Sequence, residues 1–271
     1  MANTSLDLFV ANMQEPVDFL KVGGTMQAAG ILHSLWYSAG NPGAAAAPTP
    51  GLNGAALSST SAQVAGQLPF TDPVSGNSNL ALLEAAAGVA GTLYLVDRLW
   101  HNSSIVVTTT TQQAITSPTW PARDRSGATS GAGVMVGLEV SSAMGNGSPI
   151  TNTTLAYTNS GGTGSKTATI ASFPANAVAG TFIPFSLAAG DVGVRSVQGI
   201  TLGTTYSSGT FHLVAYRILA RLGLPANQAA RKNLFELGKP RLYNGAVPFL
   251  LWRPSATTAV TVDGSVAWAQ G

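Results

Sequence analysis

The sequence predicts a mainly β fold, an antiparallel β-sandwich of the jelly-roll type with an N-terminal segment of helices and extended chain. Three observations support this prediction. Apolar and polar residues alternate with a period of two over much of residues 104–271, which is the pattern of strands that bury one face. Short stretches rich in glycine, asparagine and serine separate these runs, as turns do in sandwiches and jelly rolls. Before residue 104 the apolar spacing is helical or absent.

Strands are predicted wherever this alternation is sustained. The clearest runs are 105–110 and 134–141, and the others are 150–158, 166–173, 181–187, 194–202, 210–219, 248–253, 259–263 and 265–269. Turn sequences lie between them at 145–147, 159–164, 189–191 and 207–209. The pair Asp263 and Gly264 separates two alternating runs and is the sharpest hairpin signal in the chain, because Asp-Gly favours a two-residue hairpin turn.

Helical spacing of apolar residues predicts helices over residues 25–37 and 79–100. The second is apolar on nearly every side, so it is expected to be buried on most faces, either in the chain's own core or at an interface. A short helix is predicted over 225–237, with Gly238 at its end. Residues 40–66 are rich in Ala, Gly, Pro and Ser, which is typical of an extended arm or linker.

These patterns divide the chain into two predicted parts. Residues 1–103 form an arm with helices that attaches the protein to its partners, and residues 104–271 form the β-sandwich domain. Apolar side chains of the first part, which such an arm would press against a neighbour, are the candidate contact residues. They are Phe9, Trp36, Leu80, Leu83, Ala87, Tyr94 and Trp100.

Charged residues make up only 9% of the 271 residues, whereas hydrophobic residues make up 45%. Soluble globular domains typically carry roughly 25% charged residues, and the centres of large interfaces are depleted in Lys, Glu and Asp. The composition therefore favours a protein whose surface faces neighbouring subunits. The alternative is a monomer solvated by its many Ser, Thr, Asn and Gly residues.

Nucleic-acid and membrane partners are not expected. The net charge of +2 comes from scattered bases, and nothing resembles the clustered Lys and Arg that hold phosphate backbones. The longest apolar run, residues 80–96, is interrupted by Glu84 and is shorter than the ~20 residues that cross a bilayer.

Residue types that form catalytic or metal sites are scarce. The chain has no cysteine, which excludes disulfides, thiolate metal ligands and thiol nucleophiles. The three histidines, His33, His101 and His212, fall in different predicted elements, and no pair has metal-ligand spacing. We therefore expect structural histidines, no metal and no cofactor.

The carboxylates mostly stand alone in the sequence, so no local pair offers acid and base catalysis. Asp124 is expected in a solvated charged loop, and Asp191 in a turn. A glycine-rich stretch ending in Ser165 and Lys166 departs from the phosphate-binding loop, which needs glycine directly before the lysine and a helix afterwards. These observations predict that the protein is not an enzyme.

Several motifs stand out beyond the period-two pattern. They are the run 133–140, Ala-Gly-Thr-Phe-Ile-Pro-Phe at 179–185, Gly-Asp-Val-Gly-Val-Arg-Ser-Val at 190–197, the strand 211–217, and Leu-Val-Asp-Arg-Leu-Trp-His at 95–101. The span 133–217 resembles proteins encoded in the structural gene blocks of tailed bacteriophages, and residues 95–101 are similar to the same group. The motifs are structural, so they indicate that the protein is a component of a phage particle more specifically than they indicate where in the particle it lies.

The resemblance implies a virion protein, assembled in the host cytoplasm, of the capsid cement or decoration type that stabilises the shell. Such subunits are commonly trimers, so the implied partners are copies of the same chain in a homotrimer and the major capsid protein or another virion protein. A structural protein of the neck, tail or baseplate is the alternative. A virion-associated glycan-binding or hydrolytic module is a further alternative.

Overall fold

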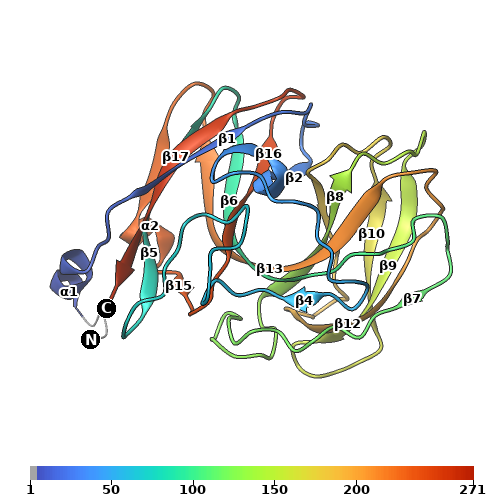
Figure 1. Ribbon diagram of the computed structural model, residues 1–271, viewed down its shortest axis with the longest axis horizontal. Coiled ribbons are helices and arrows are strands. Elements are labelled where there is room, and N and C mark those ends of the chain that lie inside the picture. The colour runs from blue at the N-terminus through green and yellow to red at the C-terminus, as the bar shows by residue number, and fades with distance from the viewer. Residues whose placement is uncertain (1–4) are drawn as a thin grey trace. The chain divides into compact units, whose positions relative to one another are not determined.

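Antiparallel β-sheets dominate the computed structural model, which describes residues 5–271 and is 44% strand and 5% helix. The predicted mainly β, antiparallel fold is confirmed. The chain divides into two units (Figure 1). The first consists of the described residues up to 45, together with 58–97 and 218–271, and the second consists of 46–57 and 98–217. Strands β6 (Gly91–His101) and β13 (Thr210–Leu224) contribute residues to both.

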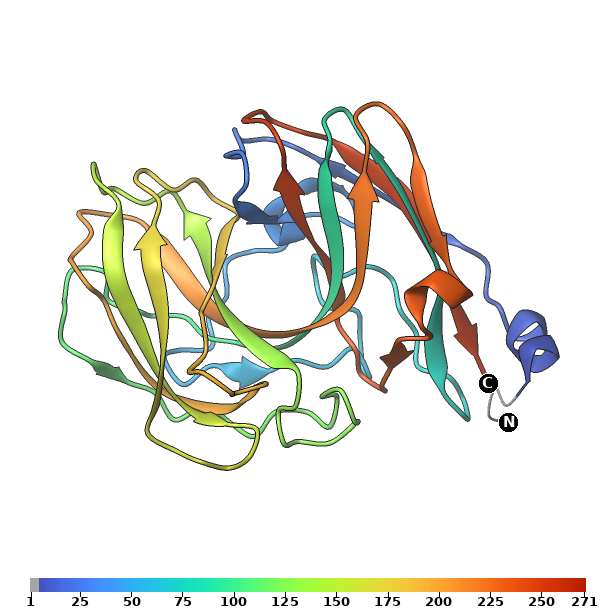
Figure 2. The same ribbon diagram turned by 180° about the vertical axis from the view of Figure 1, so that it is seen from behind.

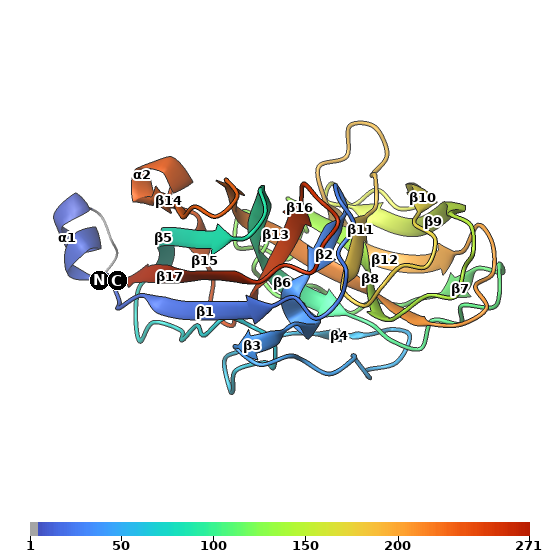
Figure 3. The ribbon, with the colours of Figure 1, turned by 90° about the horizontal axis from the view of Figure 1, so that it is seen from above.

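In the first unit, β17 (Val262–Gln270) is the central strand of a sheet. It pairs with β5 (Ser78–Ala87) on one side and β1 (Val17–Val22) on the other, and Figure 3 shows it lying between these two strands. The sheet is completed at its edges by β3 (Ala39–Asn41), β14 (Ala230–Asn233) and β15 (Arg241–Leu242). Beside it, β16 (Pro248–Pro254) pairs with β2 (Leu32–Ser34) and with β6.

The second unit contains a four-stranded sheet in the order β10-β9-β12-β7. Figure 2 shows the yellow-green β9 and the yellow β10 side by side. These strands are β7 (Gln113–Ala114), β9 (Ile150–Asn159), β10 (Lys166–Phe173) and β12 (Val194–Thr201). In the same unit, β8 (Val134–Ser142) pairs with β11 (Thr181–Pro184) and β13, and β4 (Ala55–Ala56) pairs with the end of β6.

Each unit has its own hydrophobic core. The core of the first unit gathers side chains from β5, β6, β13, β16 and β17, such as Leu83 and Trp252. The core of the second gathers side chains from β8, β9, β10, β12 and β13, such as Val136, Tyr157 and Phe211. The predicted division after residue 103 therefore does not coincide with the two units, because residues on both sides of it share the first core. Residues 1–4 of the predicted arm lie outside the described residues.

Most predicted strands of the second half are present. The runs at 134–141, 150–158, 166–173, 181–187, 194–202, 210–219 and 248–253 correspond to β8, β9, β10, β11, β12, β13 and β16. The strand predicted at 105–110 is wrong. There the side-chain oxygen of Gln113 accepts from the Val106 N–H, and its side-chain nitrogen donates to the Val106 carbonyl oxygen, each at 2.8 Å. These two bonds take the place of those that a neighbouring strand would make.

The helix predicted over 79–100 is also wrong, because β5 and β6 occupy this segment and are joined by a short turn that contains Gly88. β6 is buried on both faces, so its sequence is a continuous apolar run that periodicity cannot distinguish from a buried helix. The helix predicted over 25–37 is replaced by β2 and the short 3-10 helix η1 (Leu35–Tyr37).

Residues 5–271 contain two short α-helices, α1 (Leu6–Ala11) and α2 (Leu234–Leu237). The helix predicted over 225–237 is thus limited to its last four residues. Asn233 begins α2 with a capping box that includes Glu236, and Gly238 ends it in the left-handed conformation, at φ 69°. The predicted end of this helix is confirmed and its predicted start is wrong.

The hairpin predicted at Asp263 and Gly264 is wrong, since both residues lie within β17. Gly264 pairs with Ala85 of β5 and with Phe19 of β1. A Cβ at this position would lie 2.1 Å from the carbonyl oxygen of Glu84 and 2.8 Å from the Phe19 ring. Glycine here allows the close approach of neighbouring chains in a strand interior.

Candidate functional site

The predicted contact residues lie mainly in the chain's own interior. Six of the seven are at most 4% exposed: Phe9, Trp36, Leu80, Leu83, Ala87 and Trp100. Tyr94 is half-buried, with the Arg221 guanidinium 5.8 Å from its ring centroid. Because the six side chains pack inside a single chain, they stabilise its core, and an apolar contact surface has to be formed by other residues.

Exposed large apolar side chains are concentrated instead in the N-terminal part of the sequence. Among residues 5–271 there are eleven of them, and six fall in the first 26 residues, with exposed fractions from 41% to 60%. These six, Leu6, Val10, Met13, Leu20, Val22 and Met26, are called the N-terminal apolar set below. Within α1, Leu6 and Val10 are one turn apart and share a face, and within β1, Leu20 and Val22 share a side.

Strand β1 has its charged and apolar side chains in unusual positions. Leu20 and Val22 point outward, at 42% and 41% exposure, whereas Lys21 between them is only 2% exposed. The Lys21 ammonium donates to the carbonyl oxygen of Pro42 at 2.8 Å and to that of Ser38 at 3.4 Å. Burial lowers the pKa of Lys21 to about 8. The outer side of β1 therefore carries Leu20 and Val22 together with the exposed Asp18.

A charged cluster is buried in the second unit. The Arg98 guanidinium donates to both carboxylate oxygens of Glu139, at 2.9 and 2.7 Å, and both side chains are fully buried. The same guanidinium donates from Nε to Nδ1 of His101 at 3.2 Å, and the carbonyl oxygen of Arg98 accepts from Arg123 at 3.0 Å. This bidentate pair joins β6 to β8, which the sequence does not indicate because 41 residues separate the partners.

The structure brings two of the three histidines near this cluster. Burial, with Arg98 and His212 nearby, strongly lowers the pKa of His101, and burial also lowers the pKa of His212. His33 lies in the first unit, where its Nε2 accepts from the Ala28 N–H at 3.0 Å and burial lowers its pKa to about 4. All three rings are therefore neutral at neutral pH, as expected of structural histidines.

His212 makes a close hydrogen bond to a serine. Its Nδ1 lies 3.0 Å from the carbonyl oxygen of Asn102, which can only accept, so Nδ1 carries the proton and Nε2 accepts from the Ser141 hydroxyl at 2.6 Å. Ser141 is the extra residue of a β-bulge between β8 and β13, and bulges re-aim side chains in this way. A serine beside a neutral imidazole can form a nucleophile and base, but here a backbone carbonyl orients the ring and Thr210 shares the serine hydroxyl at 3.0 Å.

Asp124 does not lie in a solvated loop, as predicted, but is completely buried. Burial alone would raise its pKa, but hydrogen bonds hold the pKa well below its ordinary value. Its two oxygens accept, over 2.6–3.2 Å, from Ser126, Ala128, Ser130, Gly131 and Ala132. The carboxylate therefore organises the loop that follows it. Asp191 lies in a turn, as expected, and accepts from the Tyr157 hydroxyl and the Asn159 amide.

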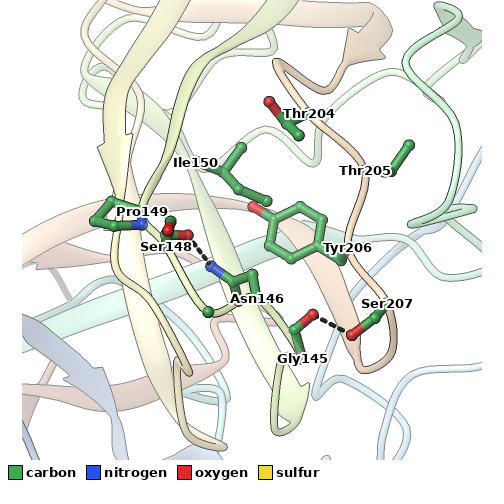
Figure 4. Close-up of a pocket in the computed structure, with 10 residues that line it drawn as sticks. Gly145, Asn146, Ser148, Pro149, Ile150, Thr204, Thr205, Tyr206 and Ser207 are labelled. Atoms are coloured by element: carbon green, nitrogen blue, oxygen red, sulfur yellow. Dashed lines mark hydrogen bonds between the residues drawn. The ribbon is translucent and has the colours of Figure 1, made fainter.

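A cavity of 490 Å³ opens in the second unit between the β8–β9 loop and the β12–β13 loop (Figure 4). None of its lining residues is charged: Gly145, Asn146, Gly147, Ser148, Pro149, Ile150, Thr204, Thr205, Tyr206 and Ser207. Two polar atoms of this lining are buried without a hydrogen-bond partner, Oδ1 of Asn146 and the hydroxyl of Tyr206. The sequence indicates only turns here, because the cavity forms from loops about 60 residues apart.

Within residues 5–271, no three His, Asp or Glu side chains converge as the ligands of a metal ion would. In the same part of the chain, no helix combines the length and the apolar character needed to cross a membrane.

No protein-family profile and no curated protein matches the sequence. Among solved structures, the chain is similar to the infectious bursal disease virus VP2 subviral particle, at 11% sequence identity and a TM-score of 0.18, over 96% of this chain and 82% of that chain. A likeness at this identity and TM-score carries no argument about what the present chain does.

Proposed function

We propose that this chain is a structural virion subunit of the capsid decoration or cement type, which acts without catalysis by associating with copies of itself and with the shell. The observation that carries the proposal is the N-terminal apolar set, six exposed apolar side chains within residues 6–26. Exposed apolar patches commonly mark contact sites, and Lys21 of β1 points inward, so that Asp18 is the charged side chain on the side that carries Leu20 and Val22.

Composition supports the same proposal. A chain with 9% charged residues has little charged surface with which to resist association. The resemblance of the motifs between residues 133 and 217 to tailed-phage structural proteins supports a place in a virion. The partners that this resemblance implies are copies of the chain in a homotrimer and the major capsid protein or another virion protein. Permanent interfaces are larger and more apolar than transient ones, which suits a subunit that holds a shell together.

Sedimentation equilibrium of the full chain at micromolar concentration tests self-association. The wild type is expected to be a trimer. A double variant, Leu20→Thr with Val22→Thr, keeps residues that favour strands at exposed positions of β1 but removes their apolar surface. It is expected to dissociate at least about tenfold more readily, a change of about 1.4 kcal/mol.

The matched control is Val106→Thr with Val192→Thr, since these valines of the second unit are more exposed than Leu20 and Val22, at 52% and 66%. This control is expected to stay trimeric. A monomeric wild type, or equal dissociation of both double variants, would refute the proposed contact. Cryo-electron microscopy of the source particle tests the location: density on the capsid surface is expected, and density in the neck or tail would replace decoration by the alternative role.

A further inference from the structure

We propose that the cavity between the β8–β9 and β12–β13 loops binds a neutral ligand rich in hydroxyl groups, the chemistry of a carbohydrate. Its volume of 490 Å³ falls within the ~300–1,000 Å³ of small-molecule sites. None of the lining residues is charged, and five carry hydroxyl groups: Ser148, Thr204, Thr205, Tyr206 and Ser207. Such a lining offers no opposite charge to an anion or a cation, and many hydrogen-bond partners to a polyol.

The side-chain oxygen of Asn146 is a hydrogen-bond acceptor to which no group within residues 5–271 donates. Its amide nitrogen donates to the carbonyl oxygens of Ser148, at 3.1 Å, and Pro174, at 3.2 Å. Carbonyl oxygens can only accept, so these two bonds determine which end of the amide is the nitrogen. The opposite atom, Oδ1, is buried without a partner, and the residue is only 7% exposed. A ligand that donates a hydrogen bond would satisfy it.

Tyr206 supplies a hydroxyl without a partner in a residue that is 1% exposed. Its ring is held edge-on by Phe173 and Phe211, with centroid distances of 6.0 and 5.6 Å, so the position of the hydroxyl is set by packing. In Figure 4 this hydroxyl points toward Ile150, which also lines the cavity. Burial raises the pKa of Tyr206, so the group stays protonated and can donate to a ligand oxygen.

Backbone hydrogen bonds hold the two loops together around the cavity. The N–H of Gly145 donates to the carbonyl oxygen of Ser208 at 3.0 Å, and the N–H of Ser207 donates to that of Gly145 at 2.9 Å. The carbonyl oxygen of Asn146 accepts from the N–H of Asn176 at 3.0 Å. These bonds hold the loops in place, so the rearrangement that binding requires is confined to a local shift of the lining, which limits its entropic cost.

A polyol matches the two unpaired atoms because each of its hydroxyls both donates and accepts. One hydroxyl donates to Asn146 Oδ1, another accepts from the Tyr206 hydroxyl, and the C–H face of the ligand packs on Pro149 and Ile150. Both polar atoms belong to residues that line the cavity, yet they are themselves buried, so binding requires a small outward shift of the loop. Gly147 has open space around it and offers the least resistance to that shift.

Saturation-transfer NMR on the full chain, with glucose, galactose, mannose and N-acetylglucosamine as probes, tests the proposal. At least one sugar is expected to bind, and Tyr206→Phe is expected to weaken its binding about five- to tenfold by removing one hydrogen bond. Since the hydroxyl has no partner in the unliganded chain, this variant is expected to keep or raise the melting temperature.

Tyr157→Phe is the matched control, because it makes the same change at a buried tyrosine of the same unit whose hydroxyl accepts from the Ala188 N–H at 3.0 Å and donates to Asp191. It is expected to lower the melting temperature and to leave sugar binding unchanged. A glycan array then distinguishes a free sugar from a surface polysaccharide, which would bind more tightly than its monosaccharide.

Three results would overturn the proposal. They are no binding by any of the sugars, equal binding by wild type and Tyr206→Phe, and a high-resolution structure with sugar present in which only an ordered water partners Asn146 and Tyr206. Binding to this cavity does not depend on self-association, so a monomeric wild type that binds sugar refutes the proposed contact and leaves this inference intact.

Discussion

Arg98 and Glu139 place two opposite charges where water cannot reach them. Replacing one partner leaves an uncompensated buried charge, which costs about 3–5 kcal/mol, whereas replacing both by apolar residues of similar volume is often neutral. Arg98→Met alone is therefore expected to lower the free energy of unfolding by about 3–5 kcal/mol. Adding Glu139→Leu is expected to recover most of that loss. Urea denaturation of the single and double variants measures both effects, and equal stability of the two variants would contradict the assignment.

His33 makes folding sensitive to mild acid. Its pKa is about 4 in the folded chain because of burial, against about 6.5 when unfolded. Below pH 6.5 the unfolded chain takes up a proton that the folded chain does not, so this contribution to stability is present above about pH 6.5 and is lost as the pH falls towards 4. His101 and His212 shift in the same direction.

The urea midpoint is accordingly expected to be lower at about pH 5 than at about pH 7. His33→Gln removes one of the three titrating groups, so the difference between the two midpoints is expected to shrink. If the difference is unchanged in the variant, His33 is not part of the response. Asp124 titrates below this window, because hydrogen bonds hold its pKa well below its ordinary value.

Ser141 and His212 provide a test of the expectation that the chain is not an enzyme. Their hydrogen bond of 2.6 Å has the length found between a nucleophile and its base, yet the other bonds of both groups are structural. A fluorophosphonate probe is expected to leave Ser141 unmodified, as judged by peptide mass spectrometry. Labelling that disappears in Ser141→Ala would indicate a hydrolytic site and overturn the non-catalytic part of the proposal.

For single residues, the sequence predicts the kind of element in which a side chain lies and its contacts with near neighbours in the chain. It does not predict hydrogen-bond partners that come from distant segments. The structural role of His212 follows from its place in an alternating run, but Ser141 and Asn102 come to it from other segments. Asp124 looks solvated beside two arginines in the sequence, and only the fold shows that its own loop wraps it. Contacts across tens of residues depend on sheet register, which local patterns do not specify.

Among the elements, strands with one buried face are predictable and strands with two are not. β10 matches its predicted bounds because its burial alternates along the strand. β6 is buried on both faces, and β5 beside it is rich in Ala and Leu, residues that favour helices, so the pair resembles one long helix. β17 is split in the prediction because a glycine that serves close packing looks like a turn residue.

Leu83→Asp distinguishes the two roles predicted for residues 79–100, which are packing in the chain's own core and contact with a neighbouring subunit. Leu83 is completely buried in β5 and belongs to the first core, so an ionised aspartate there costs several kcal/mol. The variant is expected to lose the cooperative unfolding transition by circular dichroism. Val74→Asp, at a fully exposed position, is the control and is expected to fold normally. A folded Leu83→Asp chain that only fails to associate would restore the contact role predicted from the sequence.

For the whole molecule, the two units explain why the N-terminal hundred residues are not a detachable arm. β5 and β6 lie in the first unit with β16 and β17, which come from the other end of the chain. A chain beginning at Ser103 is therefore expected to lose the fold of the first unit and to be cut rapidly by protease within residues 218–271. Rapid cleavage confined to that region supports this view, whereas a fully resistant truncated chain would favour a separate arm.

The central position of β17 also affects how the chain is made. Ribosomes release a protein from its N-terminal end, so β1, β3 and β5 emerge first, residues 98–217 follow, and the strand that joins β1 to β5 comes later still. Throughout that interval the edges that β17 will cover are open, and open edges are templates for pairing with other chains. The delay is shorter in the second unit, because the pairs β9–β10, β9–β12, β8–β13 and β4–β6 lie within residues 55–217. Nascent chains are thus most vulnerable to misassembly in the first unit, and the speed of translation through residues 88–261 sets how long that vulnerability lasts.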